Sequence, residues 1–287
     1  MIKILVPVNF SDYSINALSY ALNLAEKFQS EITLLYCFSD YLSREKMENK
    51  KFENSITSTE IEALEQNYQE RLRQLTQKVQ QDSKSNKNIR VQYRFELGYP
   101  EDLIPQISKK MKSDVIIMGT SKKDGAIKQA MGSITGDVMN KATAPVLAVP
   151  AHSKVDHHKI GTILFLMELN ERDFFSLHRL TRIITPFNTQ VIAAHHSSSK
   201  RLDKTDENQI ERLKEYCLLT YRNHKIDFEV ITGSNFVENI EGYVKENNID
   251  LIAMTRRRRT LLRQLFSPSV TKKMLYETDI PMLIFHS

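Results

Sequence analysis

Glycine, lysine and hydroxyl side chains gather in one stretch of the chain. This stretch holds Gly119 at the end of an apolar run, Lys122 in a polar loop, and Gly132-Ser133 and Thr135 where a helix is expected to open. Glycine lets backbone N–H groups approach phosphate oxygens, hydroxyl groups donate further hydrogen bonds, and a helix N-terminus adds partial positive charge. The pattern indicates a phosphate-binding loop. The alternative is a tight strand-to-helix turn whose glycines serve the backbone alone.

The elements around this loop belong to a regular alternation. Short apolar runs typical of strands covered on both faces lie at 2–8, 32–38, 89–95, 115–118 and 146–149. Apolar residues at helical spacing fill the intervals between them. Ser11 or Asp12, the pair Thr57 and Glu60, and Pro100 mark helix starts. This alternation predicts an α/β fold with a parallel sheet and helices on both faces.

The pattern then begins again. Asp114-Val-Ile-Ile-Met118 matches Asp250-Leu-Ile-Ala-Met254, and Ser133-Ile-Thr135 matches Ser269-Val-Thr271. A repeat of domain length predicts a tandem duplication. We expect one domain at 1–150, a polar linker at 151–159 and a second domain at 160–287.

Composition describes an ordinary globular protein. Hydrophobic residues make up 41% of the 287 residues, charged residues 26%, and the net charge is +5. No apolar run approaches the length of a membrane span, and the N-terminus enters a strand directly, so we expect no membrane insertion and no export. Cys37 and Cys217 each lie in an apolar segment, which favours reduced core thiols in a cytoplasmic protein over a disulfide.

The loop also carries a family pattern. Gly119, Lys122 and Gly132-Ser133 fall on the positions of the motif G-x2-G-x9-G-[ST], which is that of the universal stress proteins. The segments 4–12, 98–101 and 144–150 are similar to the opening strand, the third strand-to-helix turn and the closing strand of that family. The resemblance covers essentially the whole chain, as two such domains.

This resemblance implies two tandem five-stranded parallel-sheet domains of the adenine nucleotide alpha hydrolase-like, Rossmann-like kind. Their closing strands would pair the domains into a pseudo-dimer. It also implies ATP or AMP at the carboxyl end of the first sheet. The residues it assigns to the nucleotide are Pro7, Val8 and Asn9 after the first strand, Cys37 on the adenine side, and Met118, Gly119, Lys122, Gly132, Ser133, Ile134 and Thr135 in the phosphate loop.

Two residues of the first half depart from the family pattern. Lys122 stands where nucleotide binders have glycine, so its side chain either crowds the phosphates or supplies a cation to them. Asn9 replaces an aspartate, which removes a charge but keeps hydrogen-bonding capacity.

The second half departs further and indicates a degenerate site. Thr255, Arg258 and Pro268 replace the three glycine positions, and Leu166 and Glu168 replace Pro7 and Asn9. A carboxylate at position 168 would repel a nucleotide's phosphates.

Other polar clusters point to chemistry more weakly. Arg256 to Arg259, with Arg263, would suit an anion or nucleic acid, but no aromatic residues interleave with them, and a solvated or ion-paired loop is favoured. His152, His157 and His158 lie in the linker, where no metal site is expected. We expect His195-His196 to be structural or to line a ligand, and Asp114 and Asp250 to satisfy turn donors.

We therefore expect a stress-response module that binds nucleotide and is not an enzyme. A slow ATPase would need a positioned base and metal ligands, and the sequence indicates neither. The alternative is an interaction protein in which both sites are degenerate and the basic loop docks an unknown protein partner. Association of whole chains into a homodimer stays open, and nucleic acid is disfavoured as a partner.

Overall fold

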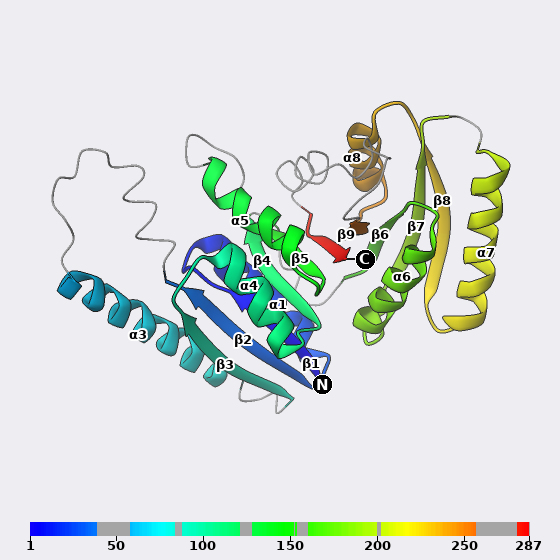
Figure 1. Cartoon of the computed structure of the whole chain (residues 1–287). Coiled ribbons are helices and arrows are strands. Elements are labelled where there is room, and N and C mark those ends of the chain that lie inside the picture. The colour runs from blue at the N-terminus through cyan, green and yellow to red at the C-terminus, as the bar shows by residue number, and fades with distance from the viewer. Residues whose placement is uncertain are drawn as a thin grey trace.

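The computed structural model describes residues 1–38, 58–83, 88–120, 128–151, 153, 160–199, 202–256 and 280–286 (Figure 1). The first half contains β1 (Ile2–Pro7), α1 (Asp12–Glu26), β2 (Ser30–Cys37), α3 (Ser58–Asp82), β3 (Ile89–Glu96), α4 (Pro100–Met111), β4 (Val115–Thr120), α5 (Lys128–Lys141) and β5 (Val146–Pro150). The second half contains β6 (Thr162–Met167), α6 (Glu171–Ile184), β7 (Gln190–Ser197), α7 (Lys204–Thr220), β8 (Lys225–Thr232), α8 (Phe236–Glu246), β9 (Leu251–Arg256) and β10 (Met282–His286).

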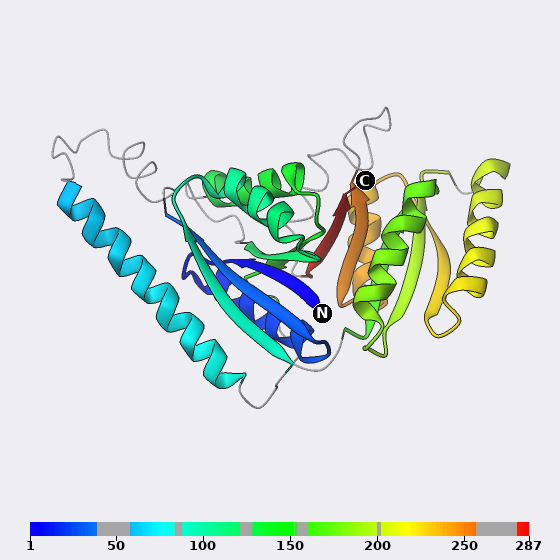
Figure 2. The ribbon, with the colours of Figure 1, turned by 60° about the horizontal axis from the view of Figure 1, so that its bottom comes forward.

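The strands form one ten-stranded sheet in the order β3-β2-β1-β4-β5-β10-β9-β6-β7-β8. Each half contributes five strands that run parallel to one another, as the sequence predicts. One buried layer lies under α1, α3, α6 and α7, and the other lies under α4, α5 and α8 (Figure 2). The architecture is therefore a doubled three-layer α/β sandwich.

Local signals explain several helix starts. The Ser11 side chain caps α1 by accepting a hydrogen bond from the Ser14 amide, and α4 begins at Pro100, where a missing N–H costs nothing. Asn170 and Asp173 form a capping box at α6. Thr57, expected to cap the helix that runs from Ser58, lies outside the described residues.

The duplication extends to the backbone. Among the described residues, a left-handed backbone occurs in three pairs, and both members of each pair occupy the same place in the two halves. The pairs, with their φ angles, are Phe10 (61°) and Leu169 (57°), Gly98 (142°) and Gly233 (153°), and Lys112 (54°) and Asn248 (49°). Side chains differ within two of these pairs, whereas Gly98 and Gly233 are both glycine, so at the other two turns the geometry belongs to the fold and not to a particular residue.

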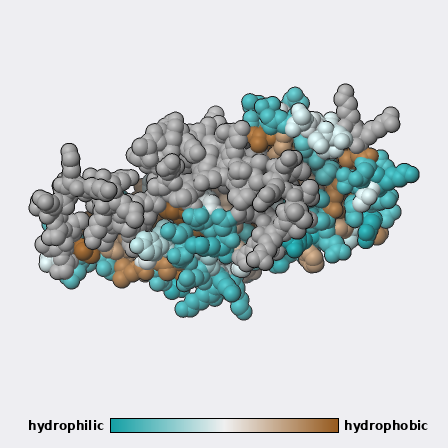
Figure 3. Space-filling model, turned by 45° about the horizontal axis from the view of Figure 1, so that its top comes forward, coloured by the Kyte–Doolittle hydropathy of each residue, from teal (hydrophilic) through white to brown (hydrophobic). Residues whose placement is uncertain are grey.

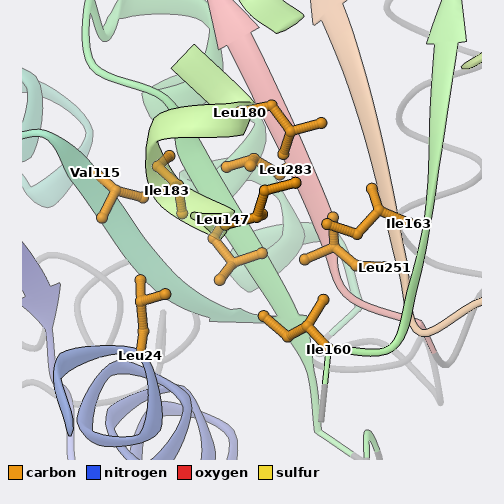
Figure 4. Close-up of a pocket in the computed structure, with 10 residues that line it drawn as sticks. Leu24, Val115, Leu147, Ile160, Ile163, Leu180, Ile183, Leu251 and Leu283 are labelled. Carbon is orange, nitrogen blue, oxygen red and sulfur yellow. The ribbon is translucent and has the colours of Figure 1, made fainter. Parts of the chain in front are cut away.

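The two halves meet at their closing strands. β5 and β10 pair antiparallel, with Leu283 opposite Leu147. Beside this pairing, Phe28 and Phe187 touch across the seam with ring centroids 6.3 Å apart. Between the halves lies a small pocket lined by ten aliphatic side chains, including Leu24, Val115 and Ile183 (Figure 4). The seam is thus an apolar interface built from equivalent surfaces of both halves.

In each half, the charge of an aspartate affects the pKa of a helix side chain in the other half. Burial raises the pKa of Tyr20 in α1, and the charge of Asp250 in the second half adds to this. At the equivalent position of α6, burial lowers the pKa of Arg179, while the charge of Asp114 in the first half opposes that change. Each half therefore places a carboxylate beside a helix of the other.

The described surface seen in Figure 3 is mostly hydrophilic, with small apolar patches between polar ones. None of the helices that the structure describes has both the length and the apolar character needed to cross a bilayer.

Candidate functional site

The candidate site of the first half lies at the carboxyl edge of the sheet. β1 pairs with β2 on one side and with β4 on the other, so the ends of these three parallel strands are neighbours. This order brings six of the expected contact residues to one edge: Pro7, Val8, Asn9, Cys37, Met118 and Gly119. Two more, Ile134 and Thr135, come from α5. The Thr135 hydroxyl donates to the carbonyl oxygen of Gly119 at 3.5 Å, which joins the helix to the strand end.

Side chains at this edge divide between the two layers of the core. Met118 is buried in the layer under α4 and α5, and Cys37 and Ile134 pack against the same layer. Val8 is buried in the opposite layer, under α1 and α3. A ligand at this edge would therefore lie across the ends of the strands, with backbone groups and polar turns as its first contacts.

Asn9 is held by the turn that follows β1. Its carboxamide oxygen accepts hydrogen bonds from the Ser11 hydroxyl at 2.6 Å and from the Ser11 amide at 3.3 Å. Its carboxamide nitrogen donates to the Tyr13 hydroxyl at 2.8 Å. The side chain is exposed but its orientation is fixed by these partners.

Gly119 has a packing role that its place in the phosphate motif does not indicate. A Cβ atom at this position would lie 2.1 Å from the Tyr13 carbonyl oxygen and 2.9 Å from the Ser14 amide nitrogen. Both are backbone atoms and cannot swing aside. The approach of α1 to β4 therefore requires glycine here whether or not a ligand is bound.

One expected feature of the loop is wrong. The helix was expected to open at Gly132-Ser133, but α5 begins at Lys128. Lys128-Gln-Ala-Met131 are all strong helix formers, and no proline or glycine interrupts them. The amides of Gly132 and Ser133 therefore lie beyond the first turn, where N–H groups point back into the helix. Lys122 lies outside the described residues.

The corresponding edge of the second half is filled by protein side chains. Met167 lies opposite His195 in the second half, just as Val8 lies next to Tyr36 in the first half. The residue after His195, His196, therefore occupies the position that Cys37 has in the first half. The His196 ring is buried, and its Nε2 lies 3.1 Å from the Asn239 side-chain nitrogen.

Gly233 makes this contact sterically feasible, because a Cβ there would lie 2.2 Å from the same Asn239 nitrogen. Burial lowers the pKa of His196, and the neighbouring His195 lowers it further.

Thr255 replaces Gly119 and changes the contact between helix and strand. Its hydroxyl donates to the Ser176 hydroxyl at 2.7 Å, and both residues are buried. In the first half the backbone of α1 packs directly against Gly119, whereas in the second half the Thr255 and Ser176 side chains lie between the helix and the strand. Arg258, Arg263 and Pro268, also named in the sequence comparison of the two halves, lie outside the described residues.

Carboxylates add negative charge to this second edge. The Asp173 carboxylate, fully buried, accepts from the amides of Glu168 at 3.0 Å and Asn170 at 3.1 Å. Glu168 itself follows β6, where Asn9 follows β1. The sequence identifies Glu168 as a departure but not Asp173, which stands where the first half has Ser14. Two carboxylates at this edge disfavour an anionic ligand.

The remaining candidates have structural roles or are not described. Asp114 accepts from the Lys3 amide at 2.9 Å, and Asp250 accepts from the Gly161 and Thr162 amides, both at 2.8 Å. Both carboxylates therefore bind backbone amides at the start of the first strand of their half, and the Lys3 amide belongs to β1 and not to a turn. Within the described ranges, no three histidine, cysteine or carboxylate side chains converge as a metal site requires. His152, His157 and His158 fall outside those ranges.

Known proteins resemble this chain in sequence and in fold. The chain is 26% identical over 152 residues to a universal stress protein of Methanocaldococcus jannaschii, a match covering 53% of this chain and 84% of the relative. A universal stress protein structure from Archaeoglobus fulgidus superimposes with a TM-score of 0.74 at 16% identity, covering 99% of this chain and 98% of the other. A structure from Pseudomonas aeruginosa superimposes with a TM-score of 0.62 at 15% identity, covering 99% and 92%.

These structural likenesses show the fold. The sequence profile of the universal stress protein family matches residues 1–150 and again residues 178–286. The chain therefore belongs to the universal stress protein family, in a tandem arrangement of two copies.

Proposed function

We propose that the first half binds one adenine nucleotide, ATP or AMP, and that the second half binds none. The observation that carries this proposal is the contrast between the two carboxyl edges. In the first half the strand ends hold an exposed polar turn at Asn9, a glycine that packs against α1, and the Thr135 hydroxyl bonded to that glycine. In the second half the equivalent places hold a His196–Asn239 contact and a Thr255–Ser176 hydrogen bond.

The proposed role is regulatory, because α1 connects the site to the seam. Its first turn touches Gly119, and farther along Asn16 donates to the carbonyl oxygens of Pro150 at 3.0 Å and Ser153 at 3.1 Å. Tyr20 and Ser153 share a hydroxyl hydrogen bond of 2.6 Å. A ligand that favours one placement of α1 would therefore bias the start of the linker, provided that its affinity differs between two states.

The test is calorimetry of the full chain with ATP and with AMP, together with two matched variants. Ser133→Ala removes a hydroxyl from the expected phosphate loop, and Ser269→Ala removes its counterpart in the second half. We expect binding to weaken roughly tenfold in the first variant and to stay unchanged in the second.

Lys122→Gly tests whether the lysine helps or hinders. Weaker binding of ATP in this variant would identify Lys122 as a cation for the phosphates, and tighter binding would identify it as an obstruction. No heat of binding in the wild type or in Lys122→Gly, together with protein that carries no adenine nucleotide when purified, would contradict the proposal. Such a result would favour an interaction protein with two degenerate sites.

A further inference from the structure

Sheet order indicates which part of a nucleotide would lie at Asn9. This inference rests on the proposed function. The base is expected at the end of β2, beside Cys37, and the phosphates at the end of β4. β1 lies between these two strands in the sheet. The sugar, which joins base to phosphates, would therefore lie over the end of β1, next to Asn9.

The hydrogen bonds of Asn9 decide what it can offer to that sugar. Both acceptor positions of its oxygen are used by the Ser11 amide and hydroxyl. Its nitrogen carries two hydrogens, and the Tyr13 hydroxyl accepts one of them. The side chain therefore presents an N–H donor and no charge to a ligand. An aspartate in the same place would present only acceptors and a negative charge.

A positive charge lies against the residue that follows Asn9 in the chain. The guanidinium carbon of Arg71, from α3, lies 4.3 Å from the centroid of the Phe10 ring and 5.2 Å from that of Tyr68. Phe10 directly follows Asn9 and stacks with Tyr68 at 6.1 Å. Aromatic rings thus hold this guanidinium in place.

Among the described residues, Arg71 forms no ion pair. Arg73, by contrast, is paired with Glu70 at 2.7 Å. The acidic residue of the first turn of α1, Asp12, is exposed and is not among those pairs.

We propose that the first-half site selects adenine nucleotides that carry a phosphate on the 2′ or 3′ hydroxyl of the ribose. A phosphate needs donors and positive charge, and it is repelled by a carboxylate. In other dinucleotide-binding sheets, an acid at the ribose selects the plain hydroxyl, while an arginine accommodates the 2′-phosphate. Asn9 and Arg71 together make the second arrangement here. Arg71 is the phosphate's charge partner, and Asn9 is the donor that replaces a repelling acid.

The experiment measures the affinity of the full chain for three probes by calorimetry: AMP, adenosine 2′,5′-bisphosphate and adenosine 3′,5′-bisphosphate. We expect at least one bisphosphate to bind roughly tenfold more tightly than AMP, since one charge-assisted contact has about that effect. Asn9→Asp should abolish this preference while AMP binding persists. Arg71→Ala should reduce bisphosphate affinity to the level of AMP. Arg73→Ala, which removes an arginine that is already paired, should change neither.

The outcomes separate this inference from the proposed function. AMP binding with no bisphosphate preference, or a preference that survives both Asn9→Asp and Arg71→Ala, would overturn the inference and leave the nucleotide site standing. Absence of binding by ATP and by all three probes would overturn both. Arg71 and Asn9 are exposed, so unchanged thermal unfolding of the variants will show that they fold.

Discussion

Replacing Gly119 by alanine should destabilise the protein even without ligand. The added Cβ would lie 2.1 Å from the Tyr13 carbonyl oxygen and 2.4 Å from its carbonyl carbon, far inside van der Waals contact. Because these are backbone atoms at the start of α1, relief requires the helix to move away from β4. Overpacking of a close contact costs about 1–3 kcal/mol, and this geometry belongs at the upper end, about 3 kcal/mol.

The assay is thermal unfolding followed by circular dichroism. For a chain of this size, about 3 kcal/mol lowers the melting temperature by roughly 6–12 °C. The matched control is Gly242→Ala in α8, where no heavy atom lies within 4 Å of the new Cβ. That substitution should stabilise the helix by about 0.5–1 kcal/mol. A Gly119→Ala protein as stable as the wild type would refute the packing role of this glycine.

Three further predictions concern the second half and the seam. Burial raises the pKa of Cys217 to about 12, so at pH 8 only about one thiol in ten thousand is ionised. We therefore expect iodoacetamide to label Cys217 only after the protein unfolds, which mass spectrometry would detect. Rapid labelling of the folded chain at Cys217 would contradict this. Phe28→Ala and Phe187→Ala should show a coupling of about 0.5–1.5 kcal/mol in a double-mutant cycle of urea unfolding, whereas strict additivity would argue against their contact across the seam. Burial lowers the pKa of His196, so the unfolded chain binds a proton that the folded chain does not, and the stability of the protein should fall as the pH drops through about 6.5. The urea midpoint of His196→Asn should therefore fall less between pH 7.5 and pH 5.5 than that of the wild type. An equal fall in both proteins would contradict this role of His196.

Much of the fold follows from apolar patterning. The strands expected at 89–95, 115–118 and 146–149 begin where expected and continue one or two residues further, to Glu96, Thr120 and Pro150. The alignment of the two repeats could also be predicted from the sequence, because Asp114 and Asp250 precede equivalent strands, and both accept backbone amides at the start of the first strand of their half. Continuous apolar runs mark these strands, because the sheet is buried on both faces.

The structure of the candidate site is harder to predict from the sequence than the fold is. The pattern Gly132-Ser133 predicts a helix start that is too late, because the helix formers before it extend α5 back to Lys128. The packing role of Gly119 depends on how closely α1 passes, which spacing alone does not encode.

Asp173 and Asn239, which help to fill the second edge, lie inside helices. For Asp173, the sequence evidence is visible only when the two halves are aligned, because Asp173 then falls at the position of Ser14. Side chains that act across elements in this way become visible only when the elements are placed together.

Native mass spectrometry of the full chain with saturating ATP tests most directly whether the two edges differ. The contrast between the exposed turn at Asn9 and the filled edge at His196 predicts one nucleotide per chain. It also predicts that Ser133→Ala lowers this occupancy and Ser269→Ala does not. Two nucleotides per chain would contradict the filled second edge, and none would contradict the site in the first half.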